Sequence, residues 1–346
     1  MLLFASLHHP HLLIFHFVYN HILSLSENTT LNDIITNKGI GILSANTMVI
    51  CFDRNSKILF ASVVEVKHKM YDQLYEFLNR DFTKDIDELN DLLNLKGNAR
   101  LANEVPPNPF VGDPNLLSPG DCIAMFGINP AYRPSKKGFY ETEIELPMDC
   151  LKKWKKNNEQ SHLDPWLNKI KNYFVSDAYY GRYFTRLGNI IGREKYRETW
   201  SKSGKYSGAR MTFHKHVLKL DIIPYYSSKA NFNEELLKYA YENHPALIQY
   251  QHFISSLLTK KMPKWIFLNG KAPLKMFECL FAEKQFQRKN TGPTKRTEIA
   301  VGKITLGGRM IPVLGVKFVN SINGPTSDED WEYIWPIWNK WLSENE

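Results

Sequence analysis

Four short apolar runs separated by helical patterns constrain the fold of this 346-residue chain more than any other feature. Each run is short enough for a buried strand, and most end in turn-forming residues. The runs occupy residues 121–128, 217–223, 264–268 and 310–319. Apolar residues at helical spacing lie between them, at 177–191, 233–243, 246–258 and 273–281, and Asp164-Pro165 opens a further helical segment. Buried strands that alternate with helices predict an α/β protein of three layers, α/β/α, with a central, mostly parallel, four-stranded sheet.

The region before residue 120 has a different character. Residues 1–47 are largely apolar. Their first 25 positions contain five histidines and no Lys or Arg, a pattern that fits neither a signal peptide nor a membrane span. We expect a dispensable or poorly ordered extension there, with Met48 as the true start. Residues 48–66 predict a β-hairpin around a polar turn. Helices are expected at 69–95, and a proline-rich linker at 103–120. The expected domains are therefore 1–47, a small α+β appendage at 48–119, and a main domain at 120–346.

Composition limits the classes of function. The formal charge of +8 is compatible with binding to nucleic acid, although many basic proteins bind none. The four cysteines lie far apart, without a CxxC pair, which argues against a zinc or iron–sulfur site and is typical of a reducing, cytoplasmic location. His214 and His216 have no carboxylate motif beside them. We expect no metal, no cofactor, no membrane association and a monomer.

Ligands in open α/β sheets bind beyond the carboxyl ends of the strands. This rule selects the loops after Ile128, Ile223, Leu268 and Val319. The first of these loops begins with Asn129-Pro130, and the last contains Asn323-Gly324. Candidate functional residues are therefore sought at these four positions.

The run Gly127-Ile128-Asn129-Pro130 at the end of an apolar strand resembles the first motif of the uracil-DNA glycosylase superfamily, in the branches that carry Asn in this motif. The later strands and loops match that family by order and context, from residue 120 to the C-terminus. The resemblance implies a uracil-DNA glycosylase-like fold. It also implies an enzyme that flips a base out of DNA and hydrolyses its N-glycosidic bond to leave an abasic site. Such a monofunctional DNA glycosylase is a hydrolase whose partner is DNA.

The resemblance also implies roles for individual residues. Asn129 would orient the hydrolytic water, because an amide is too weak a general base to do more. Asn323 stands roughly where efficient members use a His to stabilise the departing base. The residues that would bind the base are Gly127, Ile128, Ala131, Phe139, Tyr140 and Asp221.

Within this set, Ala131 replaces a bulky Tyr of the uracil-specific enzymes, and Phe139 or Tyr140 would stack on the base. Asp221 replaces an Asn that reads the pyrimidine edge, and an ionised carboxylate prefers the amino group of cytosine. These departures favour a modified cytosine, such as the glucosylated hydroxymethylcytosine of phage DNA, and hence a role in antiviral defence. A role in repair of DNA damage is the family's other function.

A further set of residues would contact the DNA backbone. The loop segment Gly324, Pro325, Thr326 and Ser327 would grip the DNA backbone, with its backbone N–H groups and hydroxyls as donors to phosphate, and Ser327 is also placed to cap the last helix. The basic candidates are Arg288, Lys289, Lys295 and Arg296.

Each assignment has an alternative. Asn129-Pro130 and Asn323-Gly324 are common turn pairs, Asp221 is also suited to pairing with a nearby Lys, and Phe139 and Tyr140 to packing in a core. Two other functions remain open: a catalytically silent nucleic-acid-binding module on the same fold, and an α/β enzyme acting on a small nucleotide.

Overall fold

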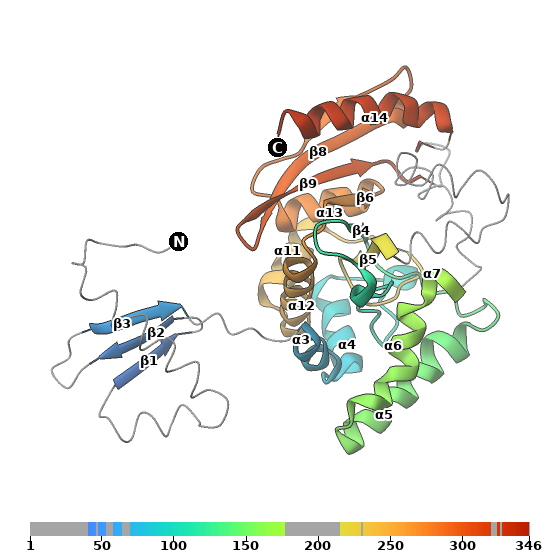
Figure 1. Ribbon diagram of the computed structural model, residues 1–346. Coiled ribbons are helices and arrows are strands. Elements are labelled where there is room, and N and C mark those ends of the chain that lie inside the picture. Colours follow the sequence, from blue (N-terminus) through green and yellow to red (C-terminus); the bar gives the residue numbers. More distant parts are fainter. Residues whose placement is uncertain are drawn as a thin grey trace. The chain divides into compact units, whose positions relative to one another are not determined.

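The computed structural model describes residues 41–45, 48–52, 58–63, 70–176, 215–229, 231–319, 324–325 and 327–345. The chain divides into two compact units, Met1–His68 and Lys69–Glu346, and each is described by itself (Figure 1). The sequence pattern indicated a boundary after residue 119, but the structure places it after residue 68. The physical reason is that Leu74, Phe77 and Ile86 are buried in the core of the larger unit.

The smaller unit contains a three-stranded antiparallel sheet in the order β1 (Gly41–Ala45), β2 (Met48–Phe52), β3 (Ile58–Val63). Strands β2 and β3 form the hairpin that the sequence predicts. Strand β1 pairs with β2 along its whole length, so residues 41–45 are part of this sheet and not of a poorly ordered extension. Residues 1–40 lie outside the described residues.

The larger unit is built on a six-stranded mixed sheet in the order β5-β4-β6-β9-β8-β7. Strands β5 (Val217–Asp221), β4 (Ile123–Gly127), β6 (Trp265–Asn269) and β9 (Arg309–Val316) pair in parallel. Strands β8 (Glu298–Leu306) and β7 (Gln287–Asn290) continue the sheet in antiparallel pairing. The expected number of four strands is therefore wrong, although the four expected strands are all present.

The two unexpected strands follow from a tight turn. Leu306 pairs with Arg309 across Gly307 and Gly308, whose φ angles are +55° and +77°. Two consecutive residues with positive φ form the hairpin turn that matches the twist of antiparallel strands, and glycine adopts this conformation without steric cost. β8 is thereby folded back onto β9.

Helices cover both faces of this sheet because successive strand residues point to opposite sides. Ala124 and Phe126 of β4 belong to one core, where the ring of Phe126 lies 4.9 Å from that of Phe277. Ile123 and Met125 belong to the other core, with Trp331 and Trp338 of the last helix. The first core takes residues from α3 (Met70–Leu78), α4 (Phe82–Leu92), α5 (Leu146–Asn157), α6 (Asp164–Lys171), α11 (Glu234–Asn243), α12 (Pro245–Lys261) and α13 (Lys271–Phe281). The second takes residues from α7 (Tyr173–Ser176) and α14 (Asp328–Ser343), which runs beside β8 and β9 (Figure 1).

Local chemistry explains where several helices begin. Ser327 caps α14 through Asp330 N, and the Asp330 side chain accepts from Ser327 N, which confirms the capping box expected at this position. Asn233 caps α11, because its side-chain oxygen accepts a hydrogen bond from Leu236 N.

The helix expected at 177–191 lies outside the described residues. Within the described part of the chain, no helix combines the length and the apolar character needed to cross a bilayer.

The proline-rich segment 103–120 is extended, as expected, but it does not separate two domains. Val111 exchanges two backbone hydrogen bonds with Lys219, of 2.8 and 2.9 Å, and Asn108 N donates to Pro224 O. The segment therefore runs along the outer edge of β5 and pairs with part of its backbone. It forms part of the structure around the carboxyl end of that strand.

Candidate functional site

The carboxyl ends of the parallel strands lie at one edge of the larger sheet, where the direction of the chain connections changes. From β4 the chain crosses to β5 on one side, whereas from β6 it continues to strands on the other side. Ligands in α/β sheets bind beyond the strand ends at such a switch point. The strands β4, β5 and β6 end there with Gly127, Asp221 and Asn269.

The amide of Asn129, two residues after β4, is held against the loop that follows β5. Its Nδ2 donates to Ser227 Oγ at 2.8 Å, to Tyr225 O at 3.2 Å and to Pro130 O at 3.1 Å. Carbonyl oxygens only accept hydrogen bonds, so the amide nitrogen and not the amide oxygen must face them. Oδ1 is therefore on the opposite side of the amide group, and no described residue donates a hydrogen bond to it.

The loop around Asn129 is joined to the β5 loop by backbone bonds as well. Ser227 N donates to Pro130 O at 3.2 Å, and Tyr132 N donates to Ser227 O at 2.9 Å. Ala131 lies between these two bonds and forms a parallel bridge with Ser227. Ser227 is buried, and only its place in a strand-end loop could have indicated it.

Asp221 ends β5 directly opposite Gly127, and the residue is only 3% exposed. Its Oδ2 accepts a hydrogen bond of 2.6 Å from Lys219 Nζ. A Cβ atom at position 127 would lie 2.2 Å from Asp221 Oδ1, so the carboxylate occupies the space that any other side chain would need. Asp221 thus pairs with a nearby Lys, which was the alternative to its contacting the base. Lys219 was not among the expected site residues, although a Lys-x-Asp pair in an apolar strand could have indicated it.

The two aromatic candidates differ in their surroundings. Phe139 is 5% exposed and packs with Val105 and Tyr226 in a small apolar cluster, with its ring perpendicular to that of Tyr226. Tyr140 begins the π-helix Tyr140–Glu145 and is 61% exposed. Of the two, only Tyr140 presents a free ring to a stacking partner.

The last loop is described only in part. Gly324 and Pro325 are buried, and a Cβ atom at Gly324 would lie 2.0 Å from the backbone oxygen of Phe318. This close approach requires glycine. Ser327 is exposed and uses its hydroxyl to cap α14. The candidates Asn323 and Thr326 lie outside the described residues.

The basic candidates lie on β7, the edge strand opposite β5, and in the segment just before β8. Arg288 and Lys289 are on β7, and the guanidinium of Arg288 forms an ion pair of 2.6 Å with Glu278. Lys295 and Arg296 lie in the short helix Lys295–Thr297 and are exposed. Strands β4 and β7 are four strand spacings apart in the sheet order, ~19 Å. DNA would have to span this distance to contact both regions at once.

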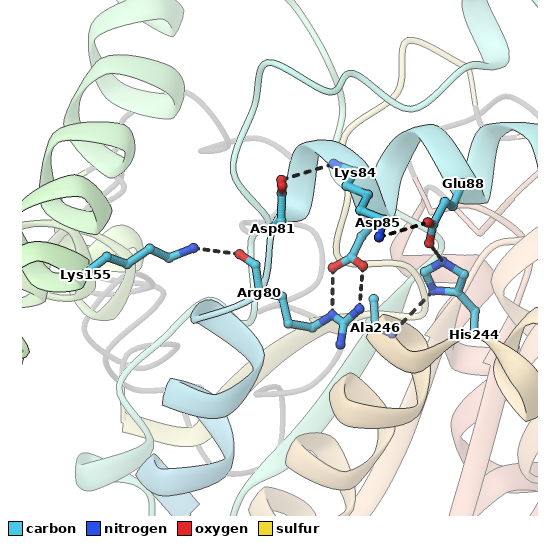
Figure 2. A network of polar contacts seen from close by, with 8 residues as sticks. All are labelled: Arg80, Asp81, Lys84, Asp85, Glu88, Lys155, His244 and Ala246. Carbon is cyan, nitrogen blue, oxygen red and sulfur yellow. Dashed lines mark hydrogen bonds and ion pairs between the residues drawn. The ribbon is translucent and has the colours of Figure 1, made fainter.

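A partly buried polar network lies where α3, α4 and α12 meet, with Asp85 and His244 buried (Figure 2). Arg80 donates two hydrogen bonds to Asp85, of 2.7 and 2.5 Å, and Lys155 Nζ donates to Arg80 O. Next to this pair, His244 Nε2 lies 3.4 Å from Glu88 Oε2. No sequence motif indicated this network, because His244 comes more than 150 positions after Asp85 and Glu88.

The ligand atoms of Asp85, Glu88 and His244 all lie within 4.8 Å of one another, which is compatible with a metal site. The hydrogen bonds argue against one. His244 Nδ1 accepts from Ala246 N at 3.3 Å as the cap of α12, so the neutral ring carries its proton on Nε2, which a metal would need free. Both oxygens of Asp85 are also held by Arg80. Asp85 is thus paired with Arg80, and His244 serves as a helix cap, so both side chains have structural partners.

Burial affects two residues of this region. It lowers the pKa of His244 below its ordinary value, against the opposing influence of Asp85 and Glu88. It raises the pKa of Tyr225 well above its ordinary value, so that the buried hydroxyl remains protonated. The backbone oxygen of Tyr225 binds Asn129, and its ring lies 6.3 Å from that of Phe77 on α3.

Comparison with models of protein families and with curated proteins finds no match to this chain.

Proposed function

We propose that the larger unit is a DNA glycosylase of the uracil-DNA glycosylase type, which flips a pyrimidine base and hydrolyses its N-glycosidic bond. The observation that carries the proposal is the orientation of Asn129. Its Nδ2 is bound to Ser227, Tyr225 and Pro130, so that Oδ1 is left to accept a hydrogen bond from water at the switch point of the sheet. The parallel order β5-β4-β6-β9, with helices on both faces, supports the same fold type.

The chemistry required of Asn129 is modest. The bond between C1′ and the base breaks first, the base leaves as an anion, and water adds to the electron-poor C1′. An amide oxygen orients the water by accepting one of its protons in a hydrogen bond, and fixing that orientation lowers the entropic part of the barrier. A rigid Asn129 is suited to this role.

The base is proposed to be a modified cytosine, with glucosylated hydroxymethylcytosine of phage DNA as the leading candidate and antiviral defence as the role. The small side chain of Ala131 supports this choice, because it is less bulky than the Tyr of the uracil-specific enzymes, and the backbone bridge to Ser227 fixes its position. The exposed ring of Tyr140 is available to stack on the base, a contact worth ~1–3 kcal/mol.

Mass spectrometry of released bases tests the proposal. The purified protein is incubated with DNA that contains uracil, 5-methylcytosine, hydroxymethylcytosine or glucosylated hydroxymethylcytosine. We expect release of the free modified base with an abasic site left behind. Asn129→Ala is expected to abolish release, whereas Asn115→Ala, at an exposed asparagine outside the site, retains it.

Three outcomes separate the alternatives. Tight, salt-dependent DNA binding without release of any base identifies a silent binding module. Efficient release of uracil alone contradicts the proposed substrate but not the proposed reaction. Hydrolysis of free nucleosides without action on DNA identifies a small-nucleotide enzyme.

A further inference from the structure

The backbone of Lys219 lies in the middle of β5, but its ammonium group lies at the carboxyl end of the strand. Lys219 pairs with Met125 in the middle of β4, two residues before the end of β5. Its side chain runs along the strand, since Nζ lies 2.6 Å from Asp221 Oδ2 and 3.8 Å from the position of a Cβ on Gly127. The long side chain thus carries a positive charge from mid-strand to the carboxyl end of the sheet.

The two members of this pair differ in exposure. The side chain of Asp221 is 4% exposed, whereas that of Lys219 is 21% exposed. The carboxylate oxygens face Gly127 and Lys219, so Asp221 is enclosed by protein groups. The lysine side chain is therefore the more accessible of the two, and Asp221 is the fixed counter-ion of its ammonium.

The Lys219 ammonium lies beside Gly127, which is close to the proposed water site at Asn129. Gly127 has no side chain, is partly exposed, and precedes Asn129 by two positions. Two residues of extended chain span at most ~7 Å. A single nucleoside can bridge that distance, with its base over Gly127 and its sugar near Asn129.

We propose that Lys219, and not Asp221, is the residue that contacts the flipped base, and that its ammonium stabilises the departing pyrimidine anion through O2. The inference rests on the proposed glycosylase function and adds a catalytic residue to it. Asp221 is then a positioning residue, which holds the ammonium at the strand end. The base must present an acceptor oxygen beside its glycosidic nitrogen, as every pyrimidine does.

The step is balanced without any further reactant. The electron pair of the C1′–N1 bond moves to N1 and is delocalised to O2, where the Lys219 ammonium donates a hydrogen bond. Water adds its oxygen to C1′, and its released proton finally neutralises the base. Lys219 remains protonated throughout, so that only water is consumed.

The dependence of rate on the leaving group tests this role. Single-turnover rates are measured for DNA that carries pyrimidines of differing N1 acidity, such as 5-fluorouracil, uracil and cytosine derivatives, with native protein and Lys219→Gln. Glutamine retains a donor for Asp221 but lacks the positive charge. We expect a loss of roughly 10²–10³-fold for poor leaving groups. The loss should become much smaller as the leaving group becomes more acidic.

Controls separate this inference from the proposed function. Lys219→Arg retains the charge and should recover part of the rate, and Lys264→Gln, at an exposed lysine beside the amino end of β6, should match native protein. An equal loss for Lys219→Gln on every base means a structural role and overturns the inference, while base release by native protein leaves the glycosylase assignment intact. If native protein releases no base from any of these DNAs, both proposals are wrong.

Discussion

Asn129 Nδ2 donates a hydrogen bond of 2.8 Å to Ser227 Oγ, a residue 98 positions later in the chain. This bond joins the loop after the central strand to the loop after its neighbour. Together with the carbonyl acceptors Tyr225 O and Pro130 O, it holds Nδ2 on this side of the amide and leaves Oδ1 on the other. The position of the proposed water therefore depends on a residue that has no chemical role of its own.

Removing this bond should impair the reaction more than it impairs the fold. Ser227→Ala leaves Asn129 with two of its three acceptors and is expected to slow base release roughly 10- to 100-fold, because a small misplacement of a positioned group is costly. Stability should fall by about 1 kcal/mol. Single-turnover kinetics and urea unfolding measure the two effects, with Ser228→Ala as the exposed neighbouring control. An unchanged rate means that Ser227 does not orient the amide.

The contact between Gly127 and Asp221 predicts a strong coupling of the two positions. Gly127→Ala forces a Cβ to within 2.2 Å of Asp221 Oδ1 and should destabilise the protein by about 1–3 kcal/mol. In the double variant with Asp221→Ala the clash is absent, so the combined loss should be smaller than the sum of the separate losses. Denaturant unfolding of the four proteins measures this cycle. Additive losses would contradict the close approach.

Because His244 is buried, we expect the stability of the protein to depend on pH in the mildly acidic range. Burial lowers its pKa in the folded protein, so the unfolded chain binds the proton more readily. The contribution of neutral His244 to stability is therefore fully present above the pKa of the unfolded chain, about 6.5, and is lost as the pH falls below it. Protonation also places a hydrogen on Nδ1, where Ala246 N now donates.

Urea unfolding between pH 5 and 8 measures this slope. His244→Asn keeps a side chain that caps helices well but does not titrate, and it should flatten the dependence. His252→Asn replaces an exposed histidine on the same helix and should keep the native slope. The same slope in all three proteins means that other groups cause the pH dependence.

The exposed pair Lys295 and Arg296 predicts a specific change in DNA binding. If both contact phosphate, Lys295→Gln with Arg296→Gln should reduce the slope of log affinity against log salt by about 1.8 on duplex DNA. Arg288→Gln should have a smaller effect, because Arg288 already pairs with Glu278. Fluorescence anisotropy at several salt concentrations gives the slopes. An unchanged slope in the double variant places the DNA elsewhere.

The sequence alone determined the main strands and several helix ends. The runs at 121–128, 217–223 and 264–268 are mostly apolar, as strands covered on both faces must be, and all three form parallel strands. The start of α14 could be predicted because the Ser327–Asp330 capping box is a local interaction between residues three positions apart. Such features depend on short-range chemistry.

The β8–β9 hairpin could also have been predicted, since Gly307-Gly308 separates two strand-like runs. What the tertiary structure alone decided is the environment of each polar residue. Nothing near Asn129 in sequence indicates Ser227, and nothing near His244 indicates Glu88, because these partners meet through the packing of distant segments. Asp221 was expected to face a ligand, yet folding buries it and leaves the neighbouring Lys219 more exposed. Burial and charge pairing are properties of the packed chain, and they determine which side chain a ligand can reach.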